Sequence, residues 1–228
     1  MILFVTGTDT EIGKTYIASS LVRQCVGSGI RVGVYKPVAS GCEVDAAGQF
    51  GPVGQLVSDD ALSLWTAAGQ TESLERVCPQ RFAAPLAPPA AAAAEGKTVD
   101  RQAMLDGAQW WLDRCDLLVV EGAGGLMSPL AEDCFNADLA ASLQATLVVV
   151  AANRLGVINH TLQTLIAAEH YRLPVAGIVL NEVSTASDAS IATNAAALRR
   201  YAQAPLWAEV ACGGEIPQQI AENLKAAL

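Results

Sequence analysis

The chain has 228 residues and a formal net charge of -9. Hydrophobic residues make up 52% of the sequence and charged residues only 16%, a composition that excludes a disordered chain. Proteins that bind nucleic acid usually present a basic surface, so the acidic balance disfavours nucleic acid as a partner. The length is enough for one sizeable core, and we expect one domain over residues 1–228.

The opening residues and the cysteines indicate the compartment. No basic region followed by an apolar run and a cleavage site begins the chain, and no apolar segment reaches the length of a membrane span without interruption. The six cysteines are scattered, with no CxxC pair and no histidine at metal-ligand spacing. Such cysteines are typical of reduced, packed thiols, so we expect a cytoplasmic protein without a membrane partner.

Short apolar runs alternate with helical patterns along the chain. The expected strands are Ile2–Val5, Arg31–Tyr35, Leu117–Val120, Thr146–Ala151, Val175–Leu180 and, more weakly, Pro205–Glu209. The expected helices are Lys14–Val26, Asp59–Ala68, Arg101–Arg114 with Asp100 as its N-cap, Ala137–Leu143, Val157–His170 and Ser187–Tyr201. This alternation predicts an α/β fold of three layers, in which a mostly parallel sheet has helices on both faces.

Two segments interrupt this alternation. Phe82–Ala94 is rich in proline and alanine and carries no charge, so we interpret it as a surface crossover between elements. Gly41–Val57 contains four glycines and a proline and is also expected to be a loop.

The first strand leads directly into a glycine-containing loop with the sequence TGTDTEIGKT, which opens the first helix. A strand, a loop, Gly-Lys-Thr and a helix form the context of a P-loop, although five residues separate Gly7 from Gly13 where four are usual. Backbone N–H groups around Gly13 and the helix dipole favour a phosphate. Lys14 would neutralise the β- and γ-phosphates, and the Thr15 hydroxyl would bind Mg²⁺. An ordinary turn with a chance Gly-Lys-Thr is the alternative.

The second strand ends in the sequence YKPVASG, which places a second lysine at its carboxyl end. Ligands of parallel sheets bind at this edge, so we expect Lys36 and Lys14, which follow adjacent early strands, to meet in one crevice. The chain has only four lysines, and half of them would gather there. The alternative is a solvated lysine at a strand end.

The third strand is followed by acidic and glycine residues in the sequence LLVVEGAGG. Apolar residues that end in an acid form a Walker-B arrangement, in which Glu121 would face Mg²⁺ from a neighbouring strand. The glycines behind it let the backbone approach a nucleotide. Glu121 could instead be a surface acid before a turn.

Asp59 and Asp60 open the second expected helix. Acidic residues favour a helix N-terminus, and capping alone would explain both of them. The alternative makes one of them a further carboxylate ligand of Mg²⁺.

These motifs stand in one order with two more, and the set is GTDTEIGKT, KPVASG, SDDAL, VVEGAGG, NRLGVINHTLQT and VLNEV. Together they resemble the dethiobiotin synthetases, ATP-dependent enzymes that precede the last step of biotin biosynthesis. The resemblance extends from Thr6 to Glu182. It implies a P-loop NTPase-like fold and a ligase that converts 7,8-diaminopelargonate, CO₂ and MgATP to dethiobiotin, ADP and phosphate.

The resemblance also implies the course of the reaction. A substrate amine captures CO₂ as a carbamate, and a carbamate oxygen takes the γ-phosphoryl group of ATP. The neighbouring amine then attacks the mixed carbamic-phosphoric anhydride, closes a cyclic urea and expels phosphate. No enzyme nucleophile is needed, so catalysis would consist of alignment and charge stabilisation.

The family pattern assigns roles to residues of this chain. Lys14 and Lys36 serve the phosphates and the carbamate, with Thr10 as a third catalytic residue, and Thr15, Asp60 and Glu121 hold Mg²⁺. The implied nucleotide contacts are Glu11, Ile12, Gly13, Lys14, Thr15, Tyr16, Asp60, Glu121, Gly122, Ala123, Gly124, Asn181 and Glu182. Asn181 would read adenine through its amide. The implied substrate contacts within the chain are Thr10, Glu11, Lys36 and Ser40.

The resemblance further implies a homodimer with active sites at the subunit interface. The substrate carboxylate would bind at a helix N-terminus of the partner chain, formed here by Gly156, Val157, Ile158 and Asn159. Unpaired N–H groups and the helix dipole suit a carboxylate. We interpret the neighbouring His160 as part of an ordinary amphipathic helix start.

The chain departs from the family pattern at three places. The Gly41–Val57 loop is longer than expected, which leaves the choice between Asp59 and Asp60 open. Glu182 stands where an aspartate is expected. Glu209–Gly213 lacks the pattern associated with contact to the base, so selectivity for adenine is not predicted.

Three other functions share parts of this pattern. An amidoligase-like domain of the cobyrinate synthase type would usually carry a C-terminal glutaminase domain. A partition or septum-positioning ATPase would need a signature lysine early in the P-loop, where this chain has Thr8–Glu11, and often a basic membrane helix at its C-terminus. An inactive nucleotide-binding scaffold would be expected to have lost its lysines or Glu121.

Overall fold

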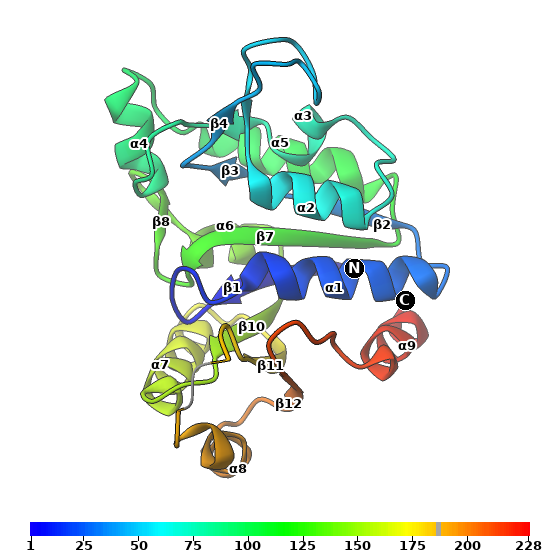
Figure 1. Cartoon of the computed structure of the whole chain (residues 1–228), viewed down its shortest axis with the longest axis vertical. Helices are drawn as coiled ribbons and strands as arrows, with labels where there is room; N and C mark the ends of the chain where they lie inside the picture. The colour runs from blue at the N-terminus through cyan, green and yellow to red at the C-terminus, as the bar shows by residue number, and fades with distance from the viewer. Residues whose placement is uncertain (186–187) are drawn as a thin grey trace.

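The computed structural model of the chain describes residues 1–185 and 188–228. Its central strands are β1 (Ile2–Gly7), β2 (Val32–Tyr35), β7 (Leu117–Gly125), β10 (Thr146–Ala152), β11 (Val175–Asn181) and β12 (Leu206–Val210). They form a six-stranded parallel sheet in the order β12-β11-β10-β1-β7-β2 (Figure 1). All six expected strands are therefore confirmed, with ends that differ by one or two residues except in β7, which continues to Gly125.

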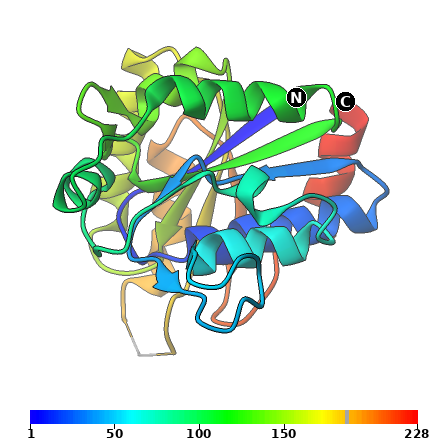
Figure 2. The same cartoon turned by 90° about the horizontal axis from the view of Figure 1, so that it is seen from above.

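Helices cover both faces of this sheet. They are α1 (Lys14–Gly27), α2 (Asp59–Ala67), α3 (Leu74–Val77), α4 (Pro88–Ala94), α5 (Arg101–Leu112), α6 (Asn136–Ser142), α7 (Val157–His170), α8 (Ile191–Tyr201) and α9 (Gln218–Ala227). Figure 2 shows α1 and α2 on one face and α5 on the other, while α9 packs on α1 and α7 packs on β10. The predicted three-layer α/β fold is confirmed. Among the described residues, no helix has the length and apolarity needed to cross a bilayer.

Short strands pair outside the central sheet. They are β3 (Val38–Ala39) with β6 (Gln80–Arg81), β4 (Glu43–Val44) with β5 (Leu56–Val57), and β8 (Pro129–Ala131) with β9 (Cys134–Phe135). The β4–β5 hairpin lies inside the segment expected to be a loop, where the Asp45 carboxylate accepts hydrogen bonds from the backbone of Gln49 and Phe50. Strands of two or three residues carry no periodicity, which is why the sequence did not predict them.

The expectation for Phe82–Ala94 is wrong over its second half, because Pro88–Ala94 forms α4. Its prolines occupy the first turn, where a missing N–H costs nothing, and a run of alanines follows. Alanine has the strongest helix propensity, so the same composition that suggested a loop favours a helix once the prolines stand at its start.

The last expected helix begins later than predicted. α8 starts at Ile191, because the Asp188 carboxylate accepts hydrogen bonds from the backbone N–H groups of Ser190 and Leu155 and so holds a turn. Ser187, the predicted first residue, lies outside the described residues. At the start of α5, Asp100 accepts a hydrogen bond from the N–H of Ala103 at 3.0 Å, which confirms it as the N-cap.

Sheet order determines which side chains meet at the carboxyl edge. β7 lies between β1 and β2, so the strands that precede Lys14 and Lys36 are not adjacent, contrary to expectation. The chain passes from β1 over the position of β7 to β2 and returns to insert β7 between them. Glu121 in β7 consequently stands between the two lysines.

Candidate active site

The loop between β1 and α1 has the backbone of a phosphate-binding turn. Gly13, the residue before α1, is left-handed with φ of 83°, and the next left-handed residue upstream is Glu11. A Cβ on Gly13 would lie 2.2 Å from Asn181 Nδ2, so a side chain has no room there. Glycine at this position therefore serves both the turn and a close approach of β11.

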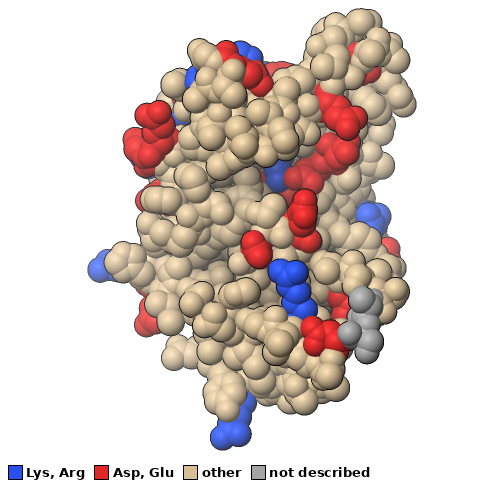
Figure 3. Space-filling view, turned by 60° about the vertical axis from the view of Figure 1, so that its left-hand side comes forward, with Lys and Arg blue, Asp and Glu red and all other residues tan. Residues whose placement is uncertain are grey.

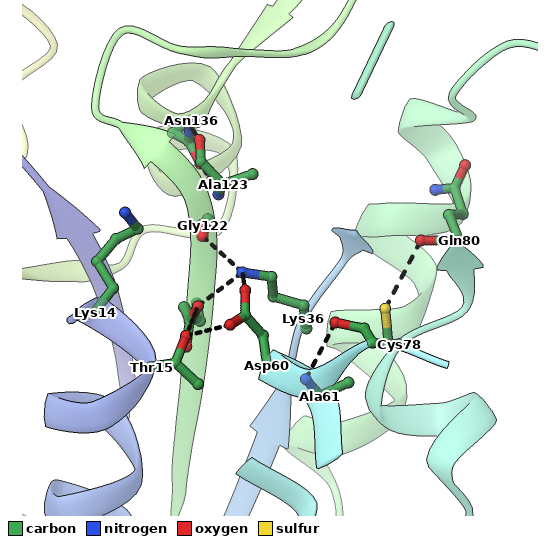
Figure 4. Close-up of polar contacts among 12 residues, drawn as sticks. Lys14, Thr15, Lys36, Asp60, Ala61, Cys78, Gln80, Gly122, Ala123 and Asn136 are labelled. Atoms are coloured by element: carbon green, nitrogen blue, oxygen red, sulfur yellow. Dashed lines mark hydrogen bonds and ion pairs between the residues drawn. The ribbon is translucent and has the colours of Figure 1, made fainter. Parts of the chain in front are cut away.

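Lys36 is the centre of a buried charged cluster. Its ammonium donates to Glu121 Oε1 at 2.7 Å, Asp60 Oδ2 at 2.8 Å and the carbonyl oxygen of Gly122 at 3.1 Å (Figure 4). The three hydrogens of the ammonium thus have three acceptors. The Lys36 side chain is 3% exposed, so Lys36 is not a solvated lysine at a strand end. The Glu121 side chain is fully buried, so Glu121 is not a surface acid.

Burial and neighbouring charges oppose each other in this cluster. Burial alone would lower the pKa of Lys36, but Glu121 and Asp60 outweigh it and hold that pKa above its ordinary value. Burial raises the pKa of Glu121, although Lys36 opposes the shift. Burial would also raise the pKa of Asp60, but Lys36 outweighs burial and lowers it. Lys36 is therefore a fixed positive charge at neutral pH.

Lys14 approaches the same crevice from α1. Its ammonium donates to the carbonyl oxygen of Asp9 at 2.9 Å, within its own loop, and Figure 4 shows it directed away from the Lys36 cluster. Burial lowers the pKa of Lys14, and repulsion from Lys36 lowers it further. The two lysines thus act on each other across one site, as predicted from the sheet edge.

The oxygens at this corner suit Mg²⁺. The Thr15 hydroxyl lies 2.6 Å from Asp60 Oδ1 and 2.8 Å from Glu121 Oε1, close to the roughly 3 Å that separates adjacent ligands of an octahedral magnesium ion. Glu121 Oε2 is buried without a hydrogen-bond partner. No group of three or more acidic, histidine or cysteine side chains forms a metal cage in the described residues. Water and phosphate oxygens would complete the shell, as Mg²⁺ prefers.

Asp59 and Asp60 have different roles in the structure. Ser58 is the N-cap of α2, because its hydroxyl accepts a hydrogen bond from the Ala61 N–H. Asp59 is exposed, whereas Asp60 contacts Thr15 and Lys36. The geometry therefore favours Asp60 as the metal ligand.

A cavity of about 410 Å³ joins these groups. It is lined by Thr10, Glu11, Ile12, Gly13, Lys14, Thr15, Lys36, Ala39, Ser40, Asp60, Ala123 and Gly124. The predicted substrate contacts Thr10, Glu11, Lys36 and Ser40 all line this cavity. Most of the predicted nucleotide contacts line it as well. Figure 3 shows the surrounding face, where acidic and basic side chains lie together along the middle of a largely uncharged surface.

Known proteins with similar sequences show to which family this chain belongs. A family described as an AAA domain matches residues 2–219. An ATP-dependent dethiobiotin synthetase BioD from Rhodopirellula baltica is 46% identical over 217 residues, which cover 91% of this chain and 82% of that protein. One from Bacillus subtilis is 39% identical over 204 residues, covering 89% and 84% of the two chains.

The chain belongs to the dethiobiotin synthetase family. The resemblance drawn from its motifs is therefore confirmed. Solved structures that share the fold include a ParA family ATPase from Chlorobium tepidum, with 13% identity, a TM-score of 0.54 and coverage of 99% of this chain and 89% of that one. FlhF complexed with GMPPNP and Mg²⁺ has 10% identity, a TM-score of 0.52 and coverage of 98% and 73%. At such identities the likeness concerns the fold alone.

The predicted nucleotide contacts Tyr16, Asn181 and Glu182 are not among the residues that line the cavity. Asn181 at the end of β11 is buried and donates its amide hydrogen to the carbonyl oxygen of Ile12 at 3.0 Å. Glu182, the next residue, is partly exposed. The Tyr16 hydroxyl donates to the carbonyl oxygen of Gly214 at 2.7 Å and so connects α1 with the chain after β12. Asn181 thus supports the P-loop, and its contact with adenine stays a prediction.

The segment expected to bind the substrate carboxylate in this family lies elsewhere. Gly156 precedes α7 with φ of 93°, and Val157, Ile158 and Asn159 form the first turn. None of these residues is among those lining the cavity of Lys14 and Lys36. Leu155, just before them, is 80% exposed. Within one chain the structure therefore does not bring this helix start to the cavity.

Two residues near the site were not singled out by the sequence. The Asp9 side chain accepts a hydrogen bond from the Thr10 N–H and lies 3.5 Å from the Arg154 guanidinium, so it supports the P-loop from outside. Asn136, at the start of α6, is fully buried and bonds to the backbone behind Glu121. An acid in a loop and an asparagine at a helix start are common, so neither residue type signalled these contacts.

Proposed function

We propose that this chain closes the ureido ring of dethiobiotin from 7,8-diaminopelargonate and CO₂ at the expense of ATP. Membership of the dethiobiotin synthetase family supports the activity. The observation that carries the assignment of the site is the cluster in which Lys36 is anchored to Asp60 and Glu121, next to the Gly-Lys-Thr of the P-loop.

The residues suit a reaction whose nucleophiles all come from the substrates. One amine of the diamine adds to CO₂ and loses a proton, which gives a carbamate. A carbamate oxygen attacks the γ-phosphorus of ATP, and ADP leaves. The second amine then attacks the carbon of the carbamic-phosphoric anhydride, the bond to the phosphate oxygen breaks, and the urea ring closes. The amine loses its proton in the same step.

Each of these steps moves negative charge between oxygens of the cavity. Lys36 is buried and charged, so it would stabilise the carbamate and the transferred phosphoryl group in a water-poor environment. Lys14 would leave the carbonyl oxygen of Asp9 for the phosphates. Thr10, Glu11 and Ser40 also line the cavity and would orient the diamine.

Mg²⁺ would be held by the Thr15 hydroxyl and the carboxylates of Asp60 and Glu121. When bound, it would neutralise phosphate charge and align the triphosphate. The lowered pKa of Asp60 keeps that ligand ionised.

We also propose that the enzyme is a cytoplasmic homodimer in which α7 of one chain serves the cavity of the other. The first turn of α7 offers N–H groups that lack partners within the helix, although that of Val157 donates to the Arg154 carbonyl oxygen at 3.1 Å. This turn does not line the cavity of its own chain. A second copy would supply the missing end of the substrate site.

Phosphate release by the purified protein tests the activity. With MgATP and bicarbonate we expect release only after 7,8-diaminopelargonate is added, together with one dethiobiotin for each phosphate, measured by mass spectrometry. Steady release without the diamine would instead indicate an ATPase switch, a function that the ParA-like fold also hosts. If no phosphate is released with or without the diamine, the chain would be an inactive scaffold.

A further inference from the structure

The floor of the cavity is a stretch of strand that has lost its strand partners. β7 pairs with β2 only as far as Val120 and with β1 as far as Glu121, and the pairing with β1 resumes at Gly125 after an irregularity. Residues 122–124 therefore stand outside both ladders. Buried backbone N–H and C=O groups need partners, so something else must satisfy them.

The side chain of Asn136 takes the place of that missing partner. Its Oδ1 accepts a hydrogen bond from the Ala123 N–H at 3.1 Å. Its Nδ2 has two hydrogens and three carbonyl acceptors, Ala123 at 2.8 Å, Gly125 at 2.9 Å and Ser128 at 3.0 Å, so that one hydrogen is shared between two of them. One fully buried amide thus binds a stretch of backbone as a neighbouring strand would. Figure 4 shows it beside Ala123 at the end of β7.

Asn136 also fixes the position of Gly122. A Cβ on Gly122 would lie 2.2 Å from Asn136 Oδ1 and 2.9 Å from Phe4 Cε1, so the glycine backbone is held directly against the amide. The carbonyl oxygen of Gly122 is in turn one of the three acceptors of the Lys36 ammonium. A path of direct contacts therefore connects Asn136 to Lys36 through a single residue.

The Gly122 carbonyl differs from the other two acceptors of Lys36. Asp60 and Glu121 are the carboxylates that would hold Mg²⁺, so their oxygens are shared between two cations. The Gly122 carbonyl oxygen is not one of the proposed ligands of Mg²⁺. It is the acceptor that can hold the ammonium in place throughout the reaction.

We propose that Asn136 is a positioning residue for phosphoryl transfer. It holds the 122–125 backbone, and through the Gly122 carbonyl it fixes where the Lys36 ammonium stands over the reacting oxygens. The catalytic part of this inference rests on the proposed function, whereas its geometric part does not. A displacement of about 1 Å at a catalytic group costs roughly 100-fold in rate, which sets the scale of the effect.

The decisive variants are Asn136→Ala and Asn136→Asp. The alanine variant removes all four bonds, and the aspartate variant keeps the shape but loses both donor hydrogens. We expect kcat for diamine-dependent phosphate release to fall about 100-fold in both. The Kd for MgATP, measured by calorimetry, should rise by a much smaller factor than kcat falls, because the hydrogen bonds of Asn136 go to Ala123, Gly125 and Ser128 and not to the Gly-Lys-Thr turn. Unchanged kcat in the aspartate variant, or a loss confined to ATP affinity, would overturn the proposal.

Asp138→Ala is the matched control on the same helix. The Asp138 carboxylate caps α6 by accepting a hydrogen bond from the Phe135 N–H at 2.8 Å, and it is not among the side chains bonded to the cavity floor. We expect a lower melting temperature with kcat within about twofold of wild type, as loss of a cap affects stability rather than the site. An equal loss of kcat would mean that Asn136 acts only through the integrity of α6.

Two further measurements test the positioning role of Asn136 without the alanine variant, in case that variant does not fold. The second of them does not depend on turnover by the wild type. Ser128→Ala removes only the hydroxyl that accepts from the Gly125 N–H, and it should lower kcat by about tenfold or less. A crystal structure of Asn136→Asp should show the Lys36 ammonium and the Gly122 oxygen beyond about 3.5 Å. An inactive wild type would reject the proposed function, whereas an unmoved Lys36 would reject this inference.

Discussion

The two ends of the substrate site are built differently. At the phosphate end, Lys36, Thr15, Asp60 and Glu121 come from separate elements and bond directly to one another inside one chain. At the other, proposed end, Gly156 and Asn159 are exposed while Val157 between them is buried, and none of these residues lines the cavity. Charged groups that must stabilise a transition state need a rigid, dry setting, whereas a group that only holds a distant carboxylate can be provided by a second chain.

The largest expected effect is at the centre of the phosphate end. Lys36→Gln should lower kcat by about 1,000-fold or more, because it removes the buried positive charge proposed to stabilise the carbamate and the transferred phosphoryl group, and Lys14 is bonded to its own loop instead. Nucleotide binding should remain, since the P-loop is intact. Calorimetry with MgATP and steady-state rates would check both parts. A near-wild-type rate would remove Lys36 from the mechanism.

A second comparison uses the neighbouring aspartates at the start of α2. Asp60→Asn should weaken activation by Mg²⁺ and lower activity by at least the roughly 10- to 100-fold that loss of a metal's outer partner costs. Asp59→Asn is the control, because Asp59 is exposed and Ser58 caps the helix. Titration of activity with MgCl₂ would measure both. Equal effects of the two substitutions would contradict the placement of Asp60.

At the far end, Asn159→Asp should raise KM for the diamine about tenfold and leave kcat nearly unchanged, because a second carboxylate would repel that of the substrate. Mixing this variant with Lys36→Gln tests whether the site is shared. Reassorted dimers should recover about a quarter of the wild-type sites with normal KM. If activity equals the sum of the separate variants, each chain uses its own α7.

The smallest effect on activity is expected at His160, the residue that follows Asn159. His160 lies near the backbone of Gly156 and belongs to the exposed surface of α7. His160 also lines a cavity of about 350 Å³ beside Asp9 and Thr10. We nevertheless expect His160→Ala to change kcat/KM by less than about threefold, because substitution of an exposed side chain usually costs little. A large loss with normal folding would extend the functional part of α7 to this side chain.

The central sheet could be predicted because its strands are buried on both faces. Val148, Val149 and Val150, for example, are nearly fully buried, and such runs appear in the sequence as unbroken apolar stretches. Parallel pairing then brings the residues after each strand to one edge, which is why Lys36 and Glu121 could be placed in one site. The order of β1, β7 and β2 was not predictable, because no strand carries a mark of its neighbour.

The remaining features depend on backbone geometry that residue types do not reveal. Asn136 acts on N–H and C=O groups of residues 122–125, and their lack of strand partners follows only from where β1 and β2 stop pairing. The choice between Asp59 and Asp60 likewise depends on Ser58 taking the cap, which moves the helix start by one residue from a cap at Asp59. The helical segment Pro88–Ala94 shows the same limit, since its composition fits a loop or a helix.

The contact between Gly13 and Asn181 has a consequence for how such enzymes can change their nucleotide preference. The loop predicted to bind the phosphates and the strand end predicted to face the base are in direct contact, because the Asn181 amide donates to the Ile12 carbonyl oxygen and leaves no room for a Cβ on Gly13. Remodelling the base pocket by a bulkier residue at position 181 would therefore shift the Gly-Lys-Thr turn itself. Altered selectivity and impaired phosphate alignment would arise together, so a switch of base is expected to need compensating substitutions on β1 or α1 as well.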